Sequence, residues 1–356
     1  MKYKNILITG GAGFIGSNFA ISFKKKYPSL KVTALDNLKR RGSELNIARL
    51  KERGVDFIHG DIRCPEDLNL RGEFDLLVEC SAEPSVLAGY GNNPLYIVNT
   101  NLTGTLNCLE LARKNKSDVV FLSTSRVYPY QALNRIKYKE GRTRLEWDGA
   151  QEVPGWSGAG VDVDFTLDGP KTLYGATKLA SEILIQEYAA NYGLKFVINR
   201  CGVIAGPGQF GKTDQGVFTL WMLAHYFKKG LKYIGFAGKG KQVRDLLHVD
   251  DLFRLVDLQA GAMARVNAKT YNVGGGRKVS LSLLEATGLC QKITGNRIKI
   301  GKEAKGRPGD VAIYLTDNNK AYSELGWLPK RQPEQLFKDI QAWIRANEKI
   351  LKRSIL

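Results

Sequence analysis

The chain of 356 residues lacks any long hydrophobic run. No stretch reaches the roughly 18 apolar residues that a membrane-spanning helix needs. The first residues, MKYKNILITGG, enter a β-rich segment without the apolar core of about 7–15 residues that marks a signal peptide. We therefore expect neither secretion nor membrane insertion, and predict a cytoplasmic protein.

The chain is also poor in the residues that bind metals or form disulfides. It has five cysteines and three histidines, and the cysteines are odd in number and widely spaced. Most of them are flanked by apolar residues, which predicts buried thiols in a reducing compartment and not a disulfide framework. We expect no metal site, because the histidines show no partnering cysteine spacing. The cysteines are Cys64, Cys80, Cys108, Cys201 and Cys290.

Acidic residues are scarce relative to basic ones. The chain has 53 Lys and Arg against 35 Asp and Glu, a formal net charge of +18 that attracts phosphate groups. The basic residues form short clusters, such as Lys24 to Lys26 and Lys39 to Arg41, without the interleaved aromatic residues of a nucleic-acid-binding module. Lys24 to Lys26 end a predicted helix, where cations interact favourably with the helix dipole. We do not expect nucleic acid as a partner, and part of the excess can face an anionic small molecule.

Apolar strand patterns alternate with helical ones through the first part of the chain. Such alternation, at these element lengths, predicts a parallel sheet covered by helices on both faces. The predicted strands are 5–10, 31–36, 55–61, 74–80, 118–124 and 195–200, and the predicted helices are 14–26, 44–53 and 99–115.

The pattern changes after residue 128. About forty polar residues with Gly and Pro follow, and a loop of that length is usually functional or disordered. Beyond residue 200 the order loosens, until an amphipathic helix at about 333–350. We predict an α/β fold with a Rossmann-type doubly wound sheet in residues 1–200 and a smaller, mixed C-terminal substrate-binding domain in residues 201–356. A segment at about 242–275 is expected to return to the first domain.

The first chemical motif is GGAGFIG, which spaces Gly10, Gly13 and Gly16 as GxxGxxG between a strand and a helix. Glycines there permit a tight turn and let backbone amides approach a pyrophosphate at the helix N-terminus. Asp36 ends the next strand, where a carboxylate accepts hydrogen bonds from a ribose diol and repels a 2′-phosphate. This pattern favours NAD over NADP, although Lys39 to Arg41 can soften the discrimination. Asp61, after the third strand, fits an adenine contact and a simple turn aspartate equally well.

The stretch GPKTLYGATKLASE, residues 169–182, places Tyr174 four residues before Lys178 in a predicted helix. The two side chains share one helix face, so the ammonium can lower the phenol pKa from its usual value near ~10. Tyr174 would then act as a general base, and Thr124, at a strand end, could bind the same substrate oxygen. An isolated pair of this kind is usually a surface tyrosine and a solvated lysine. The glycine motif and Thr124, in this chain order, favour the catalytic interpretation.

On these residues the sequence resembles the extended short-chain dehydrogenase/reductases that act on nucleotide sugars. The resemblance covers nearly the whole chain, in the order ILITGGAGFIGSN, HGDI, LSTSRVY, YGATKLASE, NRCGVIAGPGQ and GKGKQVRDLLHVDDL. The last two stretches, with TDQGVF, are most similar to the CDP-paratose 2-epimerase (CDP-tyvelose 2-epimerase) branch. This resemblance implies NAD as cofactor, a nucleoside-diphosphate sugar as substrate and a homodimer formed through helices that include the one bearing Tyr174.

The resemblance also implies roles for individual residues. Thr124, Tyr174 and Lys178 match the catalytic triad, and Thr124 also faces the substrate. The remaining substrate positions are Gln209, Asp214 and Gln215 in a loop, and Arg244 and Arg307 as arginines that hold the diphosphate. The cofactor positions are Gly10, Gly13, Phe14, Ile15, Gly16, Asp36, Asn37, Asp61, Ile62, Ser81, Ala82, Asn99, Tyr174, Lys178, Arg200 and Val203.

Two departures from the family pattern bear on the reaction. Many relatives carry a His-x-Ala motif after the fourth strand, where this chain has CSAEPS. Family members that are 4,6-dehydratases carry acidic residues directly after the strand-end threonine, where this chain has Ser125 and Arg126. Neither residue suits water elimination, so the resemblance implies an epimerase that oxidises the sugar to a keto-sugar and reduces it again on the opposite face. Alternatives are a UDP-sugar 4-epimerase, another nucleotide-sugar oxidoreductase or dehydratase, and a non-catalytic NAD- or RNA-binding protein.

Overall fold

The computed structural model describes residues 2–91, 93–211 and 215–355. The chain folds into two compact units, each built from several separate segments. Unit 1 comprises Met1–Thr124, Leu173–Arg200 and Phe253–Tyr271, and unit 2 comprises Ser125–Thr172, Cys201–Leu252 and Asn272–Leu356.

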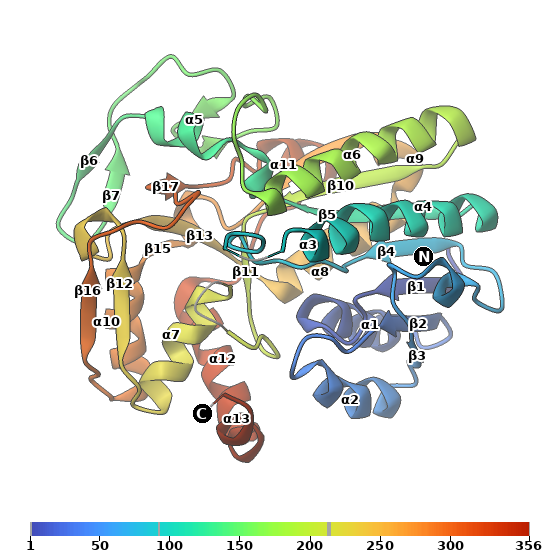
Figure 1. The fold of residues 1–356 in the computed structure, drawn as a ribbon, viewed down its shortest axis with the longest axis horizontal. Coiled ribbons are helices and arrows are strands. Elements are labelled where there is room, and N and C mark those ends of the chain that lie inside the picture. Colours follow the sequence, from blue (N-terminus) through green and yellow to red (C-terminus); the bar gives the residue numbers. More distant parts are fainter. Residues whose placement is uncertain (1, 92, 212–214, 356) are drawn as a thin grey trace. The chain divides into compact units, whose positions relative to one another are not determined.

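A seven-stranded sheet organises unit 1 (Figure 1). Its order is β14-β10-β5-β4-β1-β2-β3, and the pairs from β5 to β3 are parallel. Chain order reverses between β1 and β4, the point at which doubly wound sheets bind ligands. The predicted Rossmann-type fold class is therefore confirmed. The strands are β1 (Asn5–Thr9), β2 (Lys31–Asp36), β3 (Asp56–His59), β4 (Leu76–Glu79), β5 (Asp118–Thr124), β10 (Phe196–Cys201) and β14 (Lys269–Val273).

Helices cover both faces of this sheet, because alternate residues of each buried strand point to opposite sides. Leu7, Leu77 and Phe121 pack with residues of α4 and α6. On the α1 side, Phe19 and Phe23 make edge-on ring contacts with Phe253 of α8. The helical segments are α1 (Phe14–Lys26), η1 (Ser43–Leu45), α2 (Asn46–Glu52), η2 (Pro65–Leu68), α3 (Leu95–Val98), the π-helical η3 (Asn99–Thr103), α4 (Gly104–Asn115), α6 (Leu173–Tyr192), α8 (Val249–Gly261) and α9 (Met263–Val266).

Unit 2 contains smaller sheets. β13 (Val243–His248) pairs with β11 (Val203–Ala205), β15 (Ser280–Ser282) and β17 (Ile313–Tyr314), while β12 (Leu231–Ile234) pairs with β16 (Ile300–Glu303). A buried apolar cluster that includes Phe218, Trp221, Leu336 and Phe337 joins α7, α10 and α12 to this framework. The helical segments are η4 (Ser125–Val127), α5 (Tyr130–Arg135), α7 (Val217–Tyr226), η5 (Phe236–Gly238), η6 (Arg277–Val279), α10 (Leu283–Thr294), α11 (Asn319–Leu325), α12 (Pro333–Ala346) and α13 (Glu348–Ile355).

Residues 125–172 differ from the sequence-based expectation. They contain α5 and two short hairpins, β6 (Tyr138–Glu140) with β7 (Leu145–Trp147) and β8 (Trp156–Ser157) with β9 (Gly160–Val161), where we predicted a loop inside the first domain. Backbone bonds from Leu145 N to Lys241 O and from Val161 N to Leu315 O hold them in unit 2. Strands of two or three residues are too short to give a periodic signal. The segment that returns to unit 1 is also shorter than predicted, Phe253–Tyr271.

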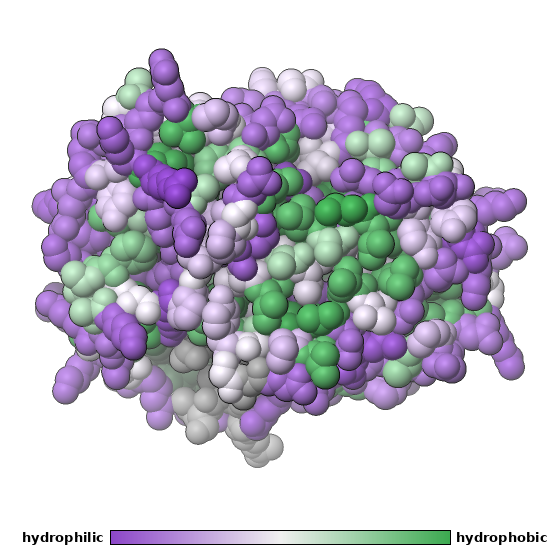
Figure 2. Space-filling view, turned by 45° about the horizontal axis from the view of Figure 1, so that its top comes forward, coloured by the Kyte–Doolittle hydropathy of each residue, from purple (hydrophilic) through white to green (hydrophobic). Residues whose placement is uncertain are grey.

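The five cysteines differ in their exposure to solvent. Cys108, Cys201 and Cys290 are buried and take part in no disulfide, whereas Cys80 is partly exposed and Cys64 exposed, because these two lie in loops that follow strand ends. None of the helices in the described part of the chain has the length and hydropathy of a membrane span. Figure 2 shows a largely hydrophilic surface with hydrophobic residues gathered on one part of the viewed face.

Candidate active site

The glycine loop after β1 is closely packed against backbone. Gly10 has a positive φ of 63°, and a Cβ there would lie 2.9 Å from the carbonyl of Cys80 and from Ser81 N. A Cβ on Gly16 would lie 2.2 Å from Gly10 O. Side chains at these positions are therefore excluded, and the turn brings β1, the loop after β4 and the start of α1 together.

This loop fits a dinucleotide. Gly13 is the N-cap of α1, and within the described residues α1 has neither a side-chain cap nor an acidic residue in its first turn. Its leading amides, in the turn that begins with Phe14 and Ile15, thus meet no carboxylate of the helix's own first turn at the positive end of the helix dipole. A pyrophosphate satisfies such amides, and the bare glycine backbone permits its approach.

Asp36 stands at the end of β2, beside the glycine loop. Its Oδ2 accepts a hydrogen bond from Ala12 N at 3.1 Å, and its Oδ1 accepts one from Leu38 N at 2.8 Å. Burial raises the pKa of this carboxyl, and the backbone hydrogen bonds act in the opposite direction. The amides of Leu38, Ala12 and Gly13 use three of the roughly four acceptor positions of the carboxylate, so Asp36 retains the capacity to accept a ribose hydroxyl.

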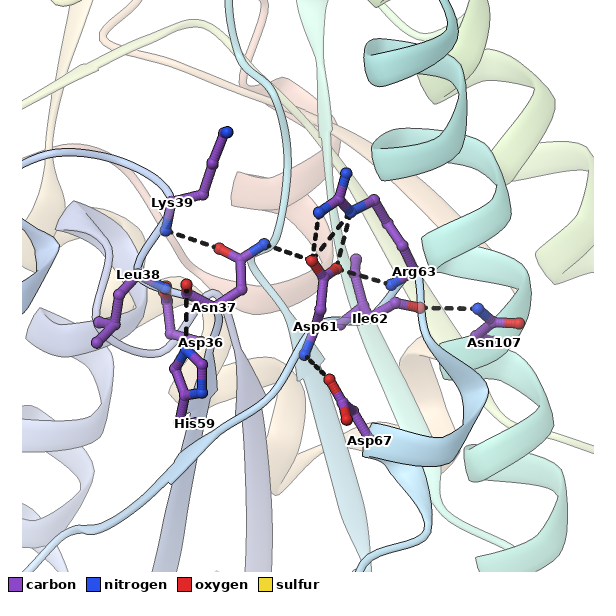
Figure 3. Close-up of polar contacts among 10 residues, drawn as sticks. All are labelled: Asp36, Asn37, Leu38, Lys39, His59, Asp61, Ile62, Arg63, Asp67 and Asn107. Carbon is purple, nitrogen blue, oxygen red and sulfur yellow. Dashed lines mark hydrogen bonds and ion pairs between the residues drawn. The ribbon is translucent and has the colours of Figure 1, made fainter.

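Asn37 and Asp61 form one polar network with Arg63 (Figure 3). Asn37 Nδ2 donates to Asp61 Oδ2 at 3.0 Å, and the Arg63 side chain donates to both carboxylate oxygens, through Nε at 3.0 Å and Nη2 at 2.5 Å. Partial burial raises the pKa of the Asp61 carboxyl. The hydrogen bonds from Arg63 and Asn37 outweigh this effect and hold the pKa at about 2. Asp61 therefore has the role of a turn aspartate in an ion pair, and its contact with adenine stays a prediction.

The neighbouring positions join this network to the helices of unit 1. Ile62 O accepts a hydrogen bond from Asn107 Nδ2 of α4 at 2.8 Å. The guanidinium carbon of Arg63 lies 5.2 Å from the ring centroid of Tyr96 in α3, and Lys39 Nζ lies 5.9 Å from the same centroid. These cation–π contacts place two positive charges around one aromatic ring beside the Asp61 loop.

Thr124, Tyr174 and Lys178 lie on two elements of unit 1 that pack together. Thr124 is the buried last residue of β5, and Tyr174 and Lys178 stand one turn apart near the start of α6. Lys178 is 1% exposed, and its Nζ lies 3.7 Å from the ring centroid of Phe121 in β5. A solvated lysine, the alternative to the catalytic interpretation, is thus excluded, because this ammonium is buried over the strand that Thr124 ends.

Arg200 of β10 has a buried partner in unit 1. Its Nη2 and Nε donate to Glu182 Oε2 at 2.8 and 3.1 Å, and Ser123 Oγ donates to Glu182 Oε1. This cluster lies one helical turn beyond Lys178 and ties α6 to β5 and β10. The guanidinium of Arg200 is therefore engaged structurally, and its predicted contact with the cofactor stays a prediction.

The loop that follows β4 contains Ser81 and Ala82, both partly buried. The next residue, Glu83, is bound by Asn101, whose Oδ1 accepts from Glu83 N at 2.7 Å and whose Nδ2 donates to Glu83 O at 3.1 Å. Asn101 also reaches Thr177 Oγ1 in α6 at 3.3 Å. This asparagine thereby fixes the loop against the helix that carries Tyr174 and Lys178.

Asn99, a predicted cofactor residue, begins the π-helical η3 and is exposed. The π-helical segment was not predicted, because residues 99–115 have the pattern of one continuous helix. Single π turns inside helices often mark functional positions.

Val203, also predicted to line the nicotinamide side, lies on β11 in unit 2 and packs partly against the apolar cluster there.

The predicted substrate residues lie in unit 2. Gln209 is buried, and its amide binds Thr219 Oγ1 at 2.5 Å and Ile204 O at 3.0 Å. Gln215 is partly buried in the described chain, and Asp214 lies outside the described residues. The side chain of Gln209 therefore shapes its own loop, and its contact with a substrate stays a prediction.

Arg244 is the most deeply buried of the predicted diphosphate residues. Its Nη2 donates to Asp310 Oδ1 at 3.0 Å and its Nη1 to Val243 O at 2.8 Å. Burial lowers the pKa of this guanidinium to about 10, and Asp310 counteracts the shift.

Arg126, the residue that replaces a dehydratase acid, donates to Gly309 O at 3.0 Å in the same unit. Arg307, predicted to hold the diphosphate with Arg244, is partly buried in the segment that leads to Gly309.

Sequence reasoning missed three buried polar residues around the catalytic helix. Glu79, Asn101 and Glu182 are each at most 1% exposed and belong to the same packed region of unit 1. A signal was present for Glu79, since it is a charged residue inside the otherwise apolar strand LLVEC. For Asn101 and Glu182 no local signal exists, because polar residues are ordinary on helices.

Known proteins match this chain over most of its length. A family model described as the NAD dependent epimerase/dehydratase family matches residues 6–274. CDP-paratose 2-epimerase from Salmonella typhi is 31% identical over 337 residues, which cover 91% of this chain and 94% of that protein. dTDP-glucose 4,6-dehydratase from Streptomyces niveus is 29% identical over 351 residues, covering 96% and 93%.

A solved structure extends the likeness to the fold. UDP-glucose 4-epimerase from Thermus thermophilus, crystallised as a complex with NAD, matches with a TM-score of 0.74 at 26% identity, over 96% of this chain and 99% of that one. Since the family model spans more than half of the residues and the glycine loop accommodates a dinucleotide, the chain belongs to the NAD-dependent epimerase/dehydratase family, and its cofactor is NAD.

Proposed function

We propose that this protein is a nucleotide-sugar epimerase most like CDP-paratose 2-epimerase. The observation that carries the proposal is the burial of the Lys178 ammonium over β5, one helical turn from Tyr174 and on the strand that Thr124 ends. A phenol, an ammonium and a hydroxyl held on packed, rigid elements form the set needed to move one proton at a sugar hydroxyl.

Tyr174, Lys178 and Thr124 have separate roles in the proposed reaction. NAD, when bound, supplies the chemistry of accepting a hydride from the sugar and returning it. Tyr174 takes the proton of the oxidised hydroxyl and gives it back when the keto group is reduced. Lys178 favours the phenolate through its positive charge, and Thr124 donates a hydrogen bond that orients the reacting oxygen. If the keto-sugar turned its other face toward bound NAD before re-reduction, the product would be the epimer, with no net change in oxidation state.

Two observations favour epimerisation over dehydration. Elimination of water needs an acid and a base, and the residues after Thr124 are Ser125 and Arg126. The Arg126 guanidinium donates a hydrogen bond to Gly309 O. A guanidinium is a donor only and cannot accept a proton, so Arg126 cannot act as the base. Dehydratases such as the Streptomyces niveus enzyme remain relatives in sequence, and a UDP-sugar 4-epimerase is the alternative function.

The experiment that tests the function is a substrate panel. CDP-, UDP-, GDP- and dTDP-linked sugars are incubated with the protein, and the products are identified by NMR. We expect one epimer to form from a CDP-sugar at C2 without stoichiometric consumption of NAD. Loss of water from any sugar would identify a dehydratase, and stoichiometric NADH would identify a net oxidoreductase.

We also propose that the protein acts as a homodimer through unit 1. Ile183 and Tyr192 of α6 are 55% and 56% exposed, and Leu95 of α3 is 59% exposed. Large apolar side chains that are exposed on helices suit a helix-to-helix interface. Sedimentation of the wild type and of Ile183→Lys tests this, with a dimer expected for the first and a monomer for the second.

A further inference from the structure

Glu79 is a carboxylate in the interior of unit 1. It is the last residue of β4, it is 0% exposed, and it follows three apolar residues of the same strand. Residues two apart on a strand share a face, so Glu79 points to the same side as Leu77, which packs with residues of α4 and α6. A charge at such a depth is costly unless an opposite charge or hydrogen bonds stabilise it.

One oxygen of Glu79 is bound and the other is not. Thr105 Oγ1 of α4 donates to Glu79 Oε1 at 2.6 Å. Oε2 is buried and has no hydrogen-bond partner among the residues that the structure describes. Burial raises the pKa of Glu79, and the positive charge of Lys178 is the strongest influence that lowers it.

Lys178 lies beside Glu79 on the same face of the sheet. Its ammonium sits 3.7 Å from the ring centroid of Phe121, and Phe121 is the residue of β5 that pairs in register with Glu79 of β4. Facing residues of neighbouring parallel strands point to the same side. A cation–π contact stabilises an ammonium by less than its burial costs, so an opposite charge nearby matters.

The other ionisable groups packed around this pair add little net charge. Cys108 of α4 is a neutral thiol, because burial and the charge of Glu79 raise its pKa well above the ordinary value. Glu182 of α6 and Arg200 of β10 neutralise each other in a buried ion pair. Glu79 is therefore the anion that balances Lys178 on this face.

We propose that Glu79 is a positioning residue that holds the Lys178 ammonium beneath Tyr174 and weakens the pull of that ammonium on the phenol. The inference rests on the proposed roles of Tyr174 and Lys178. The buried ammonium favours the phenolate, while the carboxylate stabilises the ammonium and opposes a second negative charge nearby. Glu79 thereby sets the pH above which Tyr174 accepts a proton from the sugar.

The sign of the effect follows from charge. Glu79→Gln removes one negative charge at nearly constant shape, so the phenolate becomes more favourable and Tyr174 ionises at lower pH. We expect a downward shift of about one pH unit, the size typical for loss of one buried charge near a titrating group. Thr105→Val is the matched control, because it removes the hydrogen bond to the same carboxylate and leaves the charge.

The test measures Tyr174 in the NAD-bound protein in two ways. Phenolate absorbance near 295 nm is titrated in wild type, Glu79→Gln and Thr105→Val, each compared with its own Tyr174→Phe version so that the other tyrosines cancel. The pH profile of single-turnover NADH formation is measured on the same proteins. We expect both midpoints to move down together in Glu79→Gln and much less in Thr105→Val.

An unchanged midpoint in a folded Glu79→Gln protein overturns the inference. If that variant does not fold by circular dichroism, Glu79→Asp takes its place, since its carboxylate lies one methylene further from Lys178, and a smaller shift in the same direction is expected; no shift overturns the inference. A wild type in which Tyr174 neither titrates below the ordinary tyrosine range nor supports NADH formation overturns the proposed function as well. The two failures are therefore distinguishable.

Discussion

Units 1 and 2 use their buried polar groups in different ways. In unit 1 the buried groups Glu79, Lys178, Glu182 and Arg200 lie along one face of a continuous sheet, next to the predicted catalytic residues. In unit 2 the residues predicted to bind substrate have protein partners of their own, such as Asp310 for Arg244 and Thr219 for Gln209.

The difference shows how much each unit depends on side-chain bonds for its framework. In unit 1 the parallel sheet places the strand ends that carry Glu79 and Thr124, and side-chain bonds such as that of Glu182 with Arg200 add to this framework. Short strands of two to six residues give a weaker framework, and side-chain bonds hold the loops of unit 2 in place. The expected consequence is that substitutions in unit 1 impair chemistry, and those in unit 2 impair stability and substrate binding together.

The largest expected effect is on chemistry in unit 1. Tyr174→Phe deletes one oxygen from a partly buried ring, so the fold and NAD binding should persist. Loss of a general base lowers turnover by roughly 10²–10⁴-fold. The measurement is transient NADH formation at about 340 nm in a single turnover. A Tyr174→Phe protein that reduces its NAD at the wild-type rate would show that Tyr174 has only a structural role, like the polar residues of unit 2.

The second prediction concerns stability in unit 2. Burial raises the pKa of Asp245 to about 6, above the value near 3.9 of an unfolded chain. The folded state therefore favours the protonated form, so this contribution is fully present below pH ~4 and is lost as pH rises through about 6. The loss amounts to about 3 kcal/mol, since one pKa unit corresponds to about 1.36 kcal/mol.

Asp61 in unit 1 shows the opposite dependence of stability on pH. The pKa of Asp61 is held at about 2, so its contribution to stability is present above pH ~4 and is lost as pH falls.

All five tryptophans, at positions 147, 156, 221, 327 and 343, belong to unit 2. Denaturant unfolding followed by tryptophan fluorescence between pH 4 and 7 should show the Asp245 slope in wild type and not in Asp245→Asn. An identical slope in both proteins would contradict the prediction.

The third prediction separates the ligands of the two units. Arg244→Gln should weaken binding of CDP by the ~1.5–3 kcal/mol of a charge-assisted hydrogen bond while NAD affinity is kept. Asp310→Asn is the matched control, because it breaks the same ion pair and leaves the guanidinium. Calorimetry of both ligands with both variants is the measurement. Equal losses in the two variants would mean that the ion pair acts only on the structure, and a loss of NAD affinity would place Arg244 in the wrong site.

The smallest expected effect is on cofactor choice in unit 1. Asp36→Asn keeps an acceptor for only one of the two amides, because Ala12 N and Leu38 N bind different carboxylate oxygens, and it removes the charge that repels a 2′-phosphate. The preference for NAD over NADP should narrow by about 1.5 kcal/mol, roughly tenfold. Equilibrium binding of both dinucleotides to wild type and variant measures it. A wild type that binds both equally well would refute the assignment of Asp36 to the ribose.

Features that depend on neighbours in sequence were predictable. The strand, glycine turn and helix around Gly10 to Gly16 follow within one short segment, and a Cβ on Gly13 or Gly16 would meet the carbonyl of Gly10 in that same segment. Tyr174 and Lys178 share a face because four residues make about one helical turn. Strand and helix periods likewise predicted the parallel sheet of unit 1, because such periods depend only on local geometry.

The tertiary structure alone decided the pairings between distant residues. Glu79 meets Lys178 because β4 lies beside β5, and Arg244 meets Asp310 across 66 residues of chain. The same holds for residues 125–172, whose short hairpins join unit 2 through bonds to Lys241 and Leu315. No local pattern encodes which strands become neighbours, since that depends on how the whole chain buries its apolar surface and satisfies its buried polar groups.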